Sequence, residues 1–315
     1  MSTIHSMLEA VPYTVVGQRT TIHRKGDAPA VVLLNLSSRL VRRDYLAELV
    51  TQGFAEIISV EAQENSYSVE ALSQEFPSVR FLLLPDVSNT GLNIDIAATI
   101  IVADTFLVMW SSMDIPTDVA RAEEYLRESK RICVAPGLRS DHGEQLPVVQ
   151  TPAMQRRTLR VLPLPLRGQS VTTLFPYDYV GLYHRERFLF MRGFDTLIRH
   201  RYWQLLDFGF RVAMWNREIL AAPAFRMSYR TMPEPEDQTP TPGYARFYAR
   251  NLAVRFKSGV PMVSRLQALP FALRARLSLR ETLRTFTDAA EWVNEHEQHM
   301  QRDARQVIQE WQVAN

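Results

Sequence analysis

The sequence is poor in cysteine, in lysine and in long apolar runs. Its one cysteine, Cys133, excludes a disulfide scaffold and any zinc cluster built on cysteines. No stretch approaches the roughly 18 consecutive apolar residues of a membrane-spanning helix. Residues 1–6 show neither the basic region nor the apolar core of a secretion signal. We therefore expect a cytoplasmic protein.

The composition is otherwise that of a folded protein. Of the 315 residues, 46% are hydrophobic and 22% are charged, which excludes intrinsic disorder as a description of the whole chain. The length suits one large domain or two small ones.

The charge is unevenly distributed, although the formal net charge is only +2. Residues 244–286 hold nine basic residues against one acid, Glu281, whereas residues 287–315 hold six acidic residues against two basic ones. Only three residues of the chain are lysine, so the basic charge is nearly all arginine. Arginine suits bidentate contact with phosphate, but an arginine excess equally reflects genome composition.

The first half of the chain alternates between short apolar runs and amphipathic segments. Strands are predicted at 31–36, 57–60, 79–84, 105–110 and 131–135. Helices are predicted from Ser37 to about Gly53, and over 69–76, 91–103 and 117–129. Such alternation predicts an α/β fold with a mostly parallel sheet.

The second half is less regular. Residues 137–176 contain five prolines and predict loops with one or two strands, followed by a strand at 179–183, a helix at 199–208 and a strand at 210–215. The proline-rich segment 232–243 predicts a linker, and apolar residues at helical spacing beyond it predict a helical extension. We therefore expect an α/β domain over 1–231, a linker over 232–243 and a helical extension over 244–315.

Four segments of the first 230 residues resemble GT-A-fold glycosyltransferases, specifically the nucleotide-sugar transferases of family 2. One is the opening strand–helix–strand unit, which ends at Glu61. Another is Asn-Thr-Gly-Leu-Asn at 89–93, followed by a helix and by a strand that ends at Ser-Ser-Met-Asp, 111–114. The others are Met-Arg-Gly-Phe-Asp at 191–195 and the helix–Gly–aromatic–Arg pattern around Gly209. The resemblance implies a GT-A, Rossmann-like sheet and transfer of a sugar from a nucleoside diphosphate to a glycan, lipid or protein acceptor.

The resemblance also assigns roles to individual residues. It implies a nucleotide-sugar site formed by Glu61 near the nucleobase, with Asn89, Gly91, Ser112, Asp114 and Asp195. It places Ser112-Met113-Asp114 where the family has Asp-x-Asp, so Asp114 is the candidate ligand for a divalent metal, Mg²⁺ or Mn²⁺. Asp178, flanked by aromatic residues, lies in a loop that would face the acceptor.

Two departures from the family pattern bear on catalysis. One carboxylate of the metal motif is missing, and the Glu-Asp pair that supplies the family's general base is replaced by bases and aromatics at 197–203. His200, Asp207 and Asp178 are the remaining candidate proton acceptors. With weak metal binding, the arginines at 199, 201, 211, 226 and 230 are candidates to stabilise the departing diphosphate.

Each of these residues also has a purely structural interpretation, as a helix cap, a turn residue or a partner in a surface ion pair. The alternative function is therefore a non-catalytic GT-A-fold binding or scaffold protein. A Rossmann dinucleotide protein is disfavoured, because no glycine follows the first strand.

The basic region 244–286 and the tail leave further alternatives open. The basic region is expected first to pack on the α/β domain with its arginines paired to the acidic tail, and second to contact a membrane surface peripherally. No nucleic-acid motif is present, so no nucleic-acid partner is expected. The apolar stripe from Leu283 to Trp311 suits dimerisation or docking within the chain.

Overall fold

The short apolar runs of the sequence form the central strands of the fold. The structure is a computed structural model, and it describes residues 11–17, 28–35, 43–85, 88–116, 118–155, 158–232, 237–239, 242–275 and 278–311. The described residues form one nine-stranded sheet and two hairpins. The sheet order is β1 (Thr14–Val16), β4 (Val79–Leu84), β3 (Glu56–Ala62), β2 (Ala30–Asn35), β5 (Thr105–Trp110), β10 (Gly181–His184), β6 (Arg131–Arg139), β11 (Glu218–Ser228) and β9 (Val171–Thr172).

The sheet is mostly parallel, as predicted. Strands β4, β3, β2 and β5 run parallel to one another, and β6 runs parallel to β11, whereas β10 lies antiparallel between β5 and β6. The register pairs Asn35 with Glu61 and Leu34 with Trp110, so the carboxyl ends of β2, β3 and β5 meet at one edge. Ligands of open α/β sheets bind at this edge.

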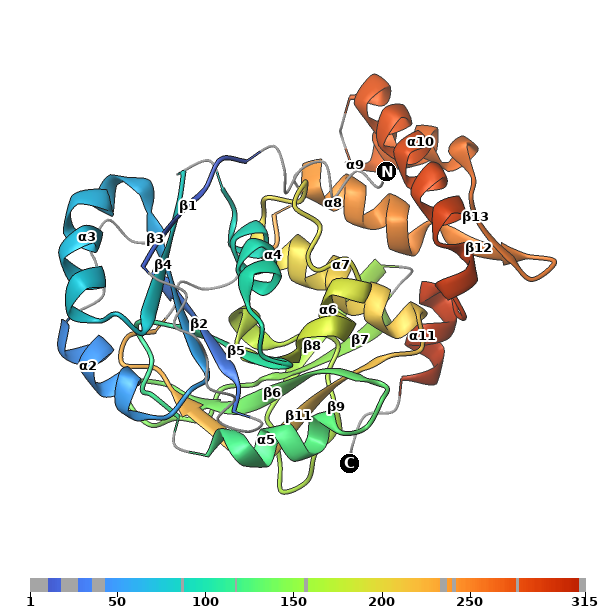
Figure 1. Ribbon diagram of the computed structural model, residues 1–315. Helices are drawn as coiled ribbons and strands as arrows, with labels where there is room; N and C mark the ends of the chain where they lie inside the picture. The colour runs from blue at the N-terminus through green and yellow to red at the C-terminus, as the bar shows by residue number, and fades with distance from the viewer. Residues whose placement is uncertain are drawn as a thin grey trace.

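Alternate residues of the central strands enter two hydrophobic cores, because successive side chains of a strand point to opposite faces. Val32 and Leu34 face a core with α4 (Thr90–Ile100), α6 (Arg185–Phe190) and α7 (Arg201–Met214). Val31 and Leu33 face a second core with α2 (Arg43–Thr51), α3 (Ser66–Glu75) and α5 (Val119–Leu126). Figure 1 shows α4, α6 and α7 together over the first face. The helix starts predicted at Ser37 and at Thr117 lie outside the described residues.

The strand predicted at 210–215 is wrong: these residues form the end of α7, which continues to Met214, and the next strand is β11. The loop-rich stretch contains the hairpin of β7 (Val149–Gln155) and β8 (Thr158–Leu164), together with β9.

The C-terminal region packs on the first core. It contains helix α8 (Pro242–Phe247), the π-helical turn η3 (Tyr248–Leu252), helix α9 (Ala268–Ala275), helix α10 (Leu279–Glu295) and helix α11 (Ala304–Glu310). Phe247 and Phe286 are fully buried in the core that also holds α7. None of the described helices is both long enough and apolar enough to cross a bilayer.

This region is not wholly helical. Strands β12 (Val254–Lys257) and β13 (Val260–Val263) form a hairpin, which projects from the molecule in Figure 1. Its two-residue turn is Ser258-Gly259, and both residues have positive φ, 52° and 82°. Turns of this kind match the twist of the paired strands, and glycine adopts positive φ at no steric cost.

Candidate functional site

A buried carboxylate lies at the carboxyl edge of β2 and β3. Glu61 is fully buried and accepts hydrogen bonds from Asn35 Nδ2 at 2.8 Å and from Ser59 Oγ at 2.7 Å. Ser111 Oγ donates to Asn35 Oδ1 at 3.3 Å, which links this pair to the residues after β5. Burial raises the pKa of Glu61 to about 7, against the lowering effect of these hydrogen bonds.

We expect Glu61→Gln to change how stability depends on pH. Between about pH 4.5 and 7 the unfolded chain loses the Glu61 proton while the folded chain keeps it. The free energy of unfolding of the wild type therefore falls as the pH rises through this window. The variant cannot titrate here, so up to about 3 kcal/mol of that fall should disappear.

Urea denaturation at pH 5 and pH 8 measures this difference. The matched control is Glu64→Gln, an exposed acid on the same segment, which should follow the wild type. If Glu61→Gln also follows the wild type, the pKa of Glu61 is not raised.

The Ser112-Met113-Asp114 segment follows β5 and is held against the end of β11. The Asp114 N–H donates to the Ser228 carbonyl at 2.9 Å, and the Arg230 N–H donates to the Ser112 carbonyl at 2.7 Å. Arg230 Nε donates to Asp114 Oδ1 at 2.7 Å, and Arg230 Nη2 lies 3.7 Å from Glu48 Oε2. The Arg230 guanidinium also lies over the Tyr45 ring, 5.1 Å from its centre.

The described residues do not fit a resident divalent metal. A divalent metal held by the protein alone needs several oxygen ligands, whereas one held together with substrate phosphates needs only one or two carboxylates. Asp114, the candidate ligand, is already paired with Arg230, and no group of three His, Cys, Asp or Glu side chains with metal-binding geometry occurs among the described residues.

Asp178 lies beside this segment in a strained turn. Its φ is 53° and that of Tyr179 is 64°, values that non-glycine residues rarely adopt and that often mark functional sites. Its carboxylate accepts from Arg201 Nη1 and from the Tyr229 hydroxyl, both at 2.9 Å. Trp110 Nε1 donates to its carbonyl at 3.0 Å. Burial raises the pKa of Asp178 to about 6, although Arg201 and Tyr229 lower it.

These contacts form three polar groups joined along the chain, which together we call the edge cluster. Glu61, Asn35 and Ser111 form the first group, and Ser112 and Asp114 hold Arg230 in the second. Tyr229, the residue before Arg230, belongs to the third group with Asp178 and Arg201. Of the residues predicted from sequence, it brings together Glu61, Ser112, Asp114 and Asp178. Asn35 and Tyr229 were missed, although the position of Asn35 at the end of the first predicted strand was an available signal.

Asn89 and Gly91 attach α4 to α7. Asn89 caps α4 by accepting from the Leu92 N–H at 3.0 Å, and it also accepts from Gln204 Nε2 at 2.9 Å. The Gly91 N–H donates to Gln204 Oε1 at 3.1 Å. A Cβ at residue 91 would overlap the Gln204 amide, so a larger residue here would displace Gln204 from its bonds to Asn89 and to the Asp195 carbonyl. A phosphate contact of the Gly91 N–H, as predicted from the sequence, would have to replace this bond to Gln204.

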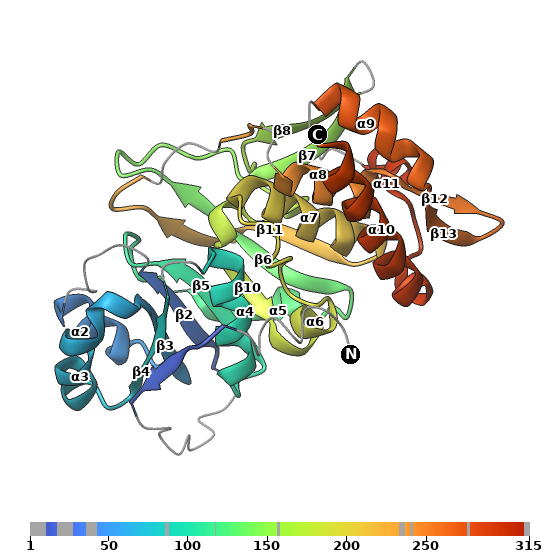
Figure 2. The same ribbon diagram turned by 90° about the horizontal axis from the view of Figure 1, so that it is seen from above.

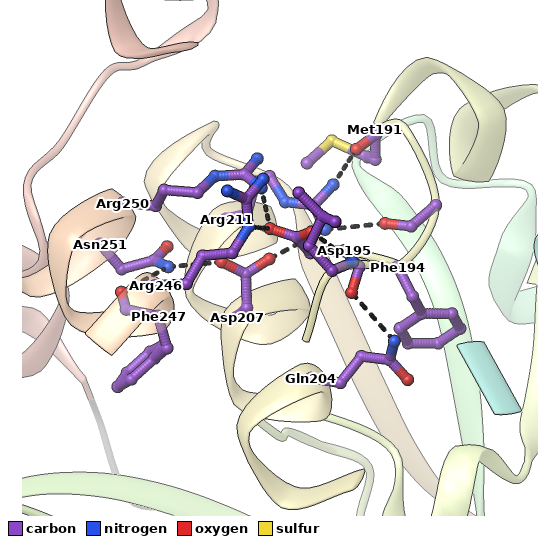
Figure 3. Close-up of polar contacts among 12 residues, drawn as sticks. Met191, Phe194, Asp195, Gln204, Asp207, Arg211, Arg246, Phe247, Arg250 and Asn251 are labelled. Atoms are coloured by element: carbon purple, nitrogen blue, oxygen red, sulfur yellow. Dashed lines mark hydrogen bonds and ion pairs between the residues drawn. The ribbon is translucent and has the colours of Figure 1, made fainter. Parts of the chain in front are cut away.

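Asp195 lies in a second, fully buried polar cluster (Figure 3). Its Oδ2 accepts from Arg246 Nε at 2.6 Å and from Arg250 Nη1, and its Oδ1 accepts from the Leu197 N–H at 3.1 Å. Burial by itself would raise the pKa of Asp195, but Arg250 and Arg246 hold it well below its usual range.

Asp207 belongs to the same buried cluster. It accepts from Arg211 Nη2 at 3.2 Å and from Asn251 Nδ2 at 2.7 Å, and Arg211 also donates to the Met191 and Gly193 carbonyls (Figure 3). These contacts bind the segment 191–195 and α7 to α8 and η3. They make both carboxylates part of the packing between α7 and the C-terminal region.

The predicted pairing of the basic region with the acidic tail is wrong for Arg246 and Arg250. Both arginines pair with Asp195 of the α/β region instead. Packing of this region on the α/β domain, the first expectation, is confirmed by the shared core.

His200 lies at the start of α7, next to Arg201. Its Nε2 is 3.4 Å from Asp237 Oδ2, and Asp237 is exposed. Among the five arginines singled out from the sequence, Arg201 and Arg230 belong to the edge cluster and Arg211 is buried with Asp207. Arg226 is exposed and contacts the Pro223 carbonyl. The remaining one, Arg199, is exposed.

Comparison with known proteins gives a likeness in structure only. No family model matches the sequence, and no curated protein is detectably similar to it. The structure is similar to the crystal structure of GalNAc-T7 with UDP, GalNAc and Mn²⁺, with a TM-score of 0.60 and 12% identity. That match covers 90% of this chain and 56% of that chain, so this chain spans little more than half of GalNAc-T7.

Two further structures match with lower scores. Staphylococcus aureus TarS has a TM-score of 0.48 and 14% identity, covering 85% of this chain and 43% of that one. The mannosyltransferase PcManGT from Pyrobaculum calidifontis, in complex with GDP-Man and Mn²⁺, has a TM-score of 0.46 and 13% identity, covering 92% and 80%. The nine-stranded sheet and the likeness to GalNAc-T7 together show that this chain has a GT-A-like α/β fold.

Proposed function

We propose that this protein is a glycosyltransferase that transfers a sugar from a nucleoside-diphosphate sugar to a glycan, lipid or protein acceptor. The observation that carries the proposal is the edge cluster, which lies at the carboxyl ends of β2, β3 and β5. In an open α/β sheet this is the edge that binds ligands.

The donor would lie along the first part of the edge cluster. Asn35 and Glu61 offer amide and carboxyl groups that can hydrogen-bond a nucleobase or ribose. Arg230 and Arg201, both partly exposed, can place guanidinium groups on the diphosphate and stabilise the charge that develops as it leaves. Ser112 and Asp114 hold Arg230 in position through its N–H and its side chain.

Proton transfer falls to Asp178 in this proposal. The acceptor hydroxyl oxygen forms a bond to the anomeric carbon while the bond from that carbon to the diphosphate breaks. The hydroxyl proton passes to the Asp178 carboxylate, and the nucleoside diphosphate leaves with the bonding electrons. A pKa of about 6 keeps this carboxylate ionised at neutral pH and close to the optimum for a general base.

A thermal-shift panel tests donor binding. Uridine, guanosine, cytidine and thymidine diphosphates and their sugars are each added with EDTA or with MnCl₂. One class of nucleotide, present at a concentration 100 times its Kd, should stabilise the protein by about 2.7 kcal/mol. We expect the same shift in EDTA, because the described residues do not fit a metal.

Arg230→Met should abolish most of that shift. The control variant Arg226→Met, which replaces an exposed arginine of β11, should leave the shift unchanged. A shift that requires Mn²⁺ would contradict the arginine-based donor site. No shift with any nucleotide would contradict the proposed function altogether.

A non-catalytic binding protein of the same fold is the second candidate. The observation in its favour is that the carboxylates of Asp195 and Asp207 are both occupied by buried arginines. Donor hydrolysis separates the two candidates, because many transferases slowly transfer the sugar to water. A protein that binds the nucleotide sugar but releases no nucleoside diphosphate would be a binding protein.

A further inference from the structure

The outer face of the α9 segment is apolar and exposed. Leu266 in η4 (Arg265–Gln267), and Leu269 and Leu273 in α9, are spaced by three and four residues and therefore share one helical face. Their exposed fractions are 87%, 52% and 73%. The opposite face, with Ala268, Phe271 and Ala272, is buried against the core. A helix that is apolar on both faces needs a partner for the outer one.

The hairpin that leads into this helix adds to the same kind of surface. Val260 and Met262 alternate with the buried Pro261 and Val263 along β13 and are 47% and 44% exposed. Only Ser264 separates β13 from η4. In both ribbon views the hairpin and α9 lie at the same end of the molecule (Figures 1 and 2). We call Val260, Met262, Leu266, Leu269 and Leu273 the leucine surface.

Positive charge is concentrated in the same stretch of the chain as the leucine surface. The exposed charged residues described between 257 and 284 are five cations and one carboxylate, Glu281; the cations are Lys257, Arg265, Arg274, Arg280 and Arg284. In the part of the chain that the structure describes, none of these five cations forms an ion pair. Arg246 and Arg250, the other basic residues of helix α8 and η3, are excluded from this surface because both pair with Asp195.

Charge and hydrophobicity together indicate one kind of partner. A second copy of the chain would bring five cations against five cations, which is unfavourable. A nucleic acid would use the arginines but would leave the three leucines without a role. A bilayer with anionic headgroups satisfies both, since its phosphates pair with arginine and its acyl boundary takes up leucine.

We propose that the leucine surface docks this protein on anionic lipid bilayers, with the leucines in the headgroup–acyl boundary and the cations of the same stretch on lipid phosphates. The inference does not depend on the proposed function, because it rests on residues outside the edge cluster and its test measures no activity.

Vesicle co-sedimentation tests the docking. The full-length protein is spun with vesicles of phosphatidylcholine alone or mixed with phosphatidylglycerol, at low and high salt. The wild type should sediment with the phosphatidylglycerol vesicles, and less so at high salt. The triple variant Leu266→Ser, Leu269→Ser, Leu273→Ser should bind at least about tenfold more weakly. The charge variant Arg265→Gln, Arg274→Gln should bind the phosphatidylglycerol vesicles at least about tenfold more weakly than the wild type does.

The matched control replaces three apolar side chains exposed elsewhere, Val102, Met154 and Leu162, with serine. It should bind like the wild type. Far-ultraviolet circular dichroism and a melting curve confirm that each variant is folded. Equal binding by the leucine variant and the wild type would overturn the proposal. The proposal would also be overturned if the wild type bound neither kind of vesicle, including the case in which it bound duplex DNA or an acidic protein instead.

Discussion

Replacing Asp195 with alanine should lower the free energy of unfolding by about 3–5 kcal/mol. The carboxylate is the shared partner of Arg246 and Arg250, and Arg250 and Asp195 are both almost completely buried. Without it, the buried Arg250 and the partly buried Arg246 lose their ion-pair partner, and the desolvation cost of their charges is no longer offset by that pairing. Urea denaturation at pH 7, followed by tryptophan fluorescence, measures the loss.

The control is Asp114→Ala, which breaks the half-exposed ion pair with Arg230 and should cost at most about 1 kcal/mol. The pH dependence gives a second check. The depressed pKa of Asp195 means that its stabilisation is present above the unfolded pKa of about 3.9 and is lost as the pH falls below it. A variant within 1 kcal/mol of the wild type would show that the buried cluster does not hold the C-terminal region in place.

Asp178→Asn should lower the transfer rate by about 100- to 10,000-fold, the usual contribution of a general base. Asparagine keeps the shape of the side chain but cannot take the acceptor proton. Donor affinity should fall far less than the rate, because Arg230 is untouched and the asparagine oxygen can still accept from Arg201. Release of nucleoside diphosphate, measured for the wild type and the variant with the same acceptor at saturating donor, gives kcat.

The pH profile distinguishes a base from a structural residue. Since the pKa of Asp178 is raised to about 6, kcat of the wild type should rise with pH through this value and then level off. The residual rate of Asp178→Asn should lack this step. Asp237→Asn, which removes only the exposed partner of His200, should keep the step. A variant that loses stability and donor binding in proportion to activity would show that Asp178 supports the turn and does not take the proton.

The central strands were predictable because each is a short apolar run closed by a turn. The end of α7 was not. Phe210, Val212 and Met214 alternate with smaller or charged residues, as in a strand, but every residue of α7 after Arg201 is buried. A helix buried on all sides has no polar face, so periodicity cannot distinguish it from a strand. Arg211 is tolerated there because it donates to main-chain carbonyls and to Asp207.

The candidate site was harder to predict, for a related reason. Asp195 and Asp207 follow motifs that suggest chemistry, but their partners Arg250 and Asn251 are 55 and 44 residues further along the chain. No local pattern indicates that those side chains meet. Glu61, Asp114 and Asp178 could be selected because the ends of strands and the turns beside them are visible in the sequence. The hairpin turn at Ser258-Gly259 was also visible, but the apolar residues around it suggested a helix.

The distance along the chain between Asp195 and its arginines has a consequence during synthesis. A ribosome adds about 5–20 residues per second, so Arg246 and Arg250 are made about 3–10 s after Asp195. Burying the Asp195 carboxylate without these partners is costly. The native packing of the segment 191–195 therefore depends on residues that are synthesised 51 and 55 positions later.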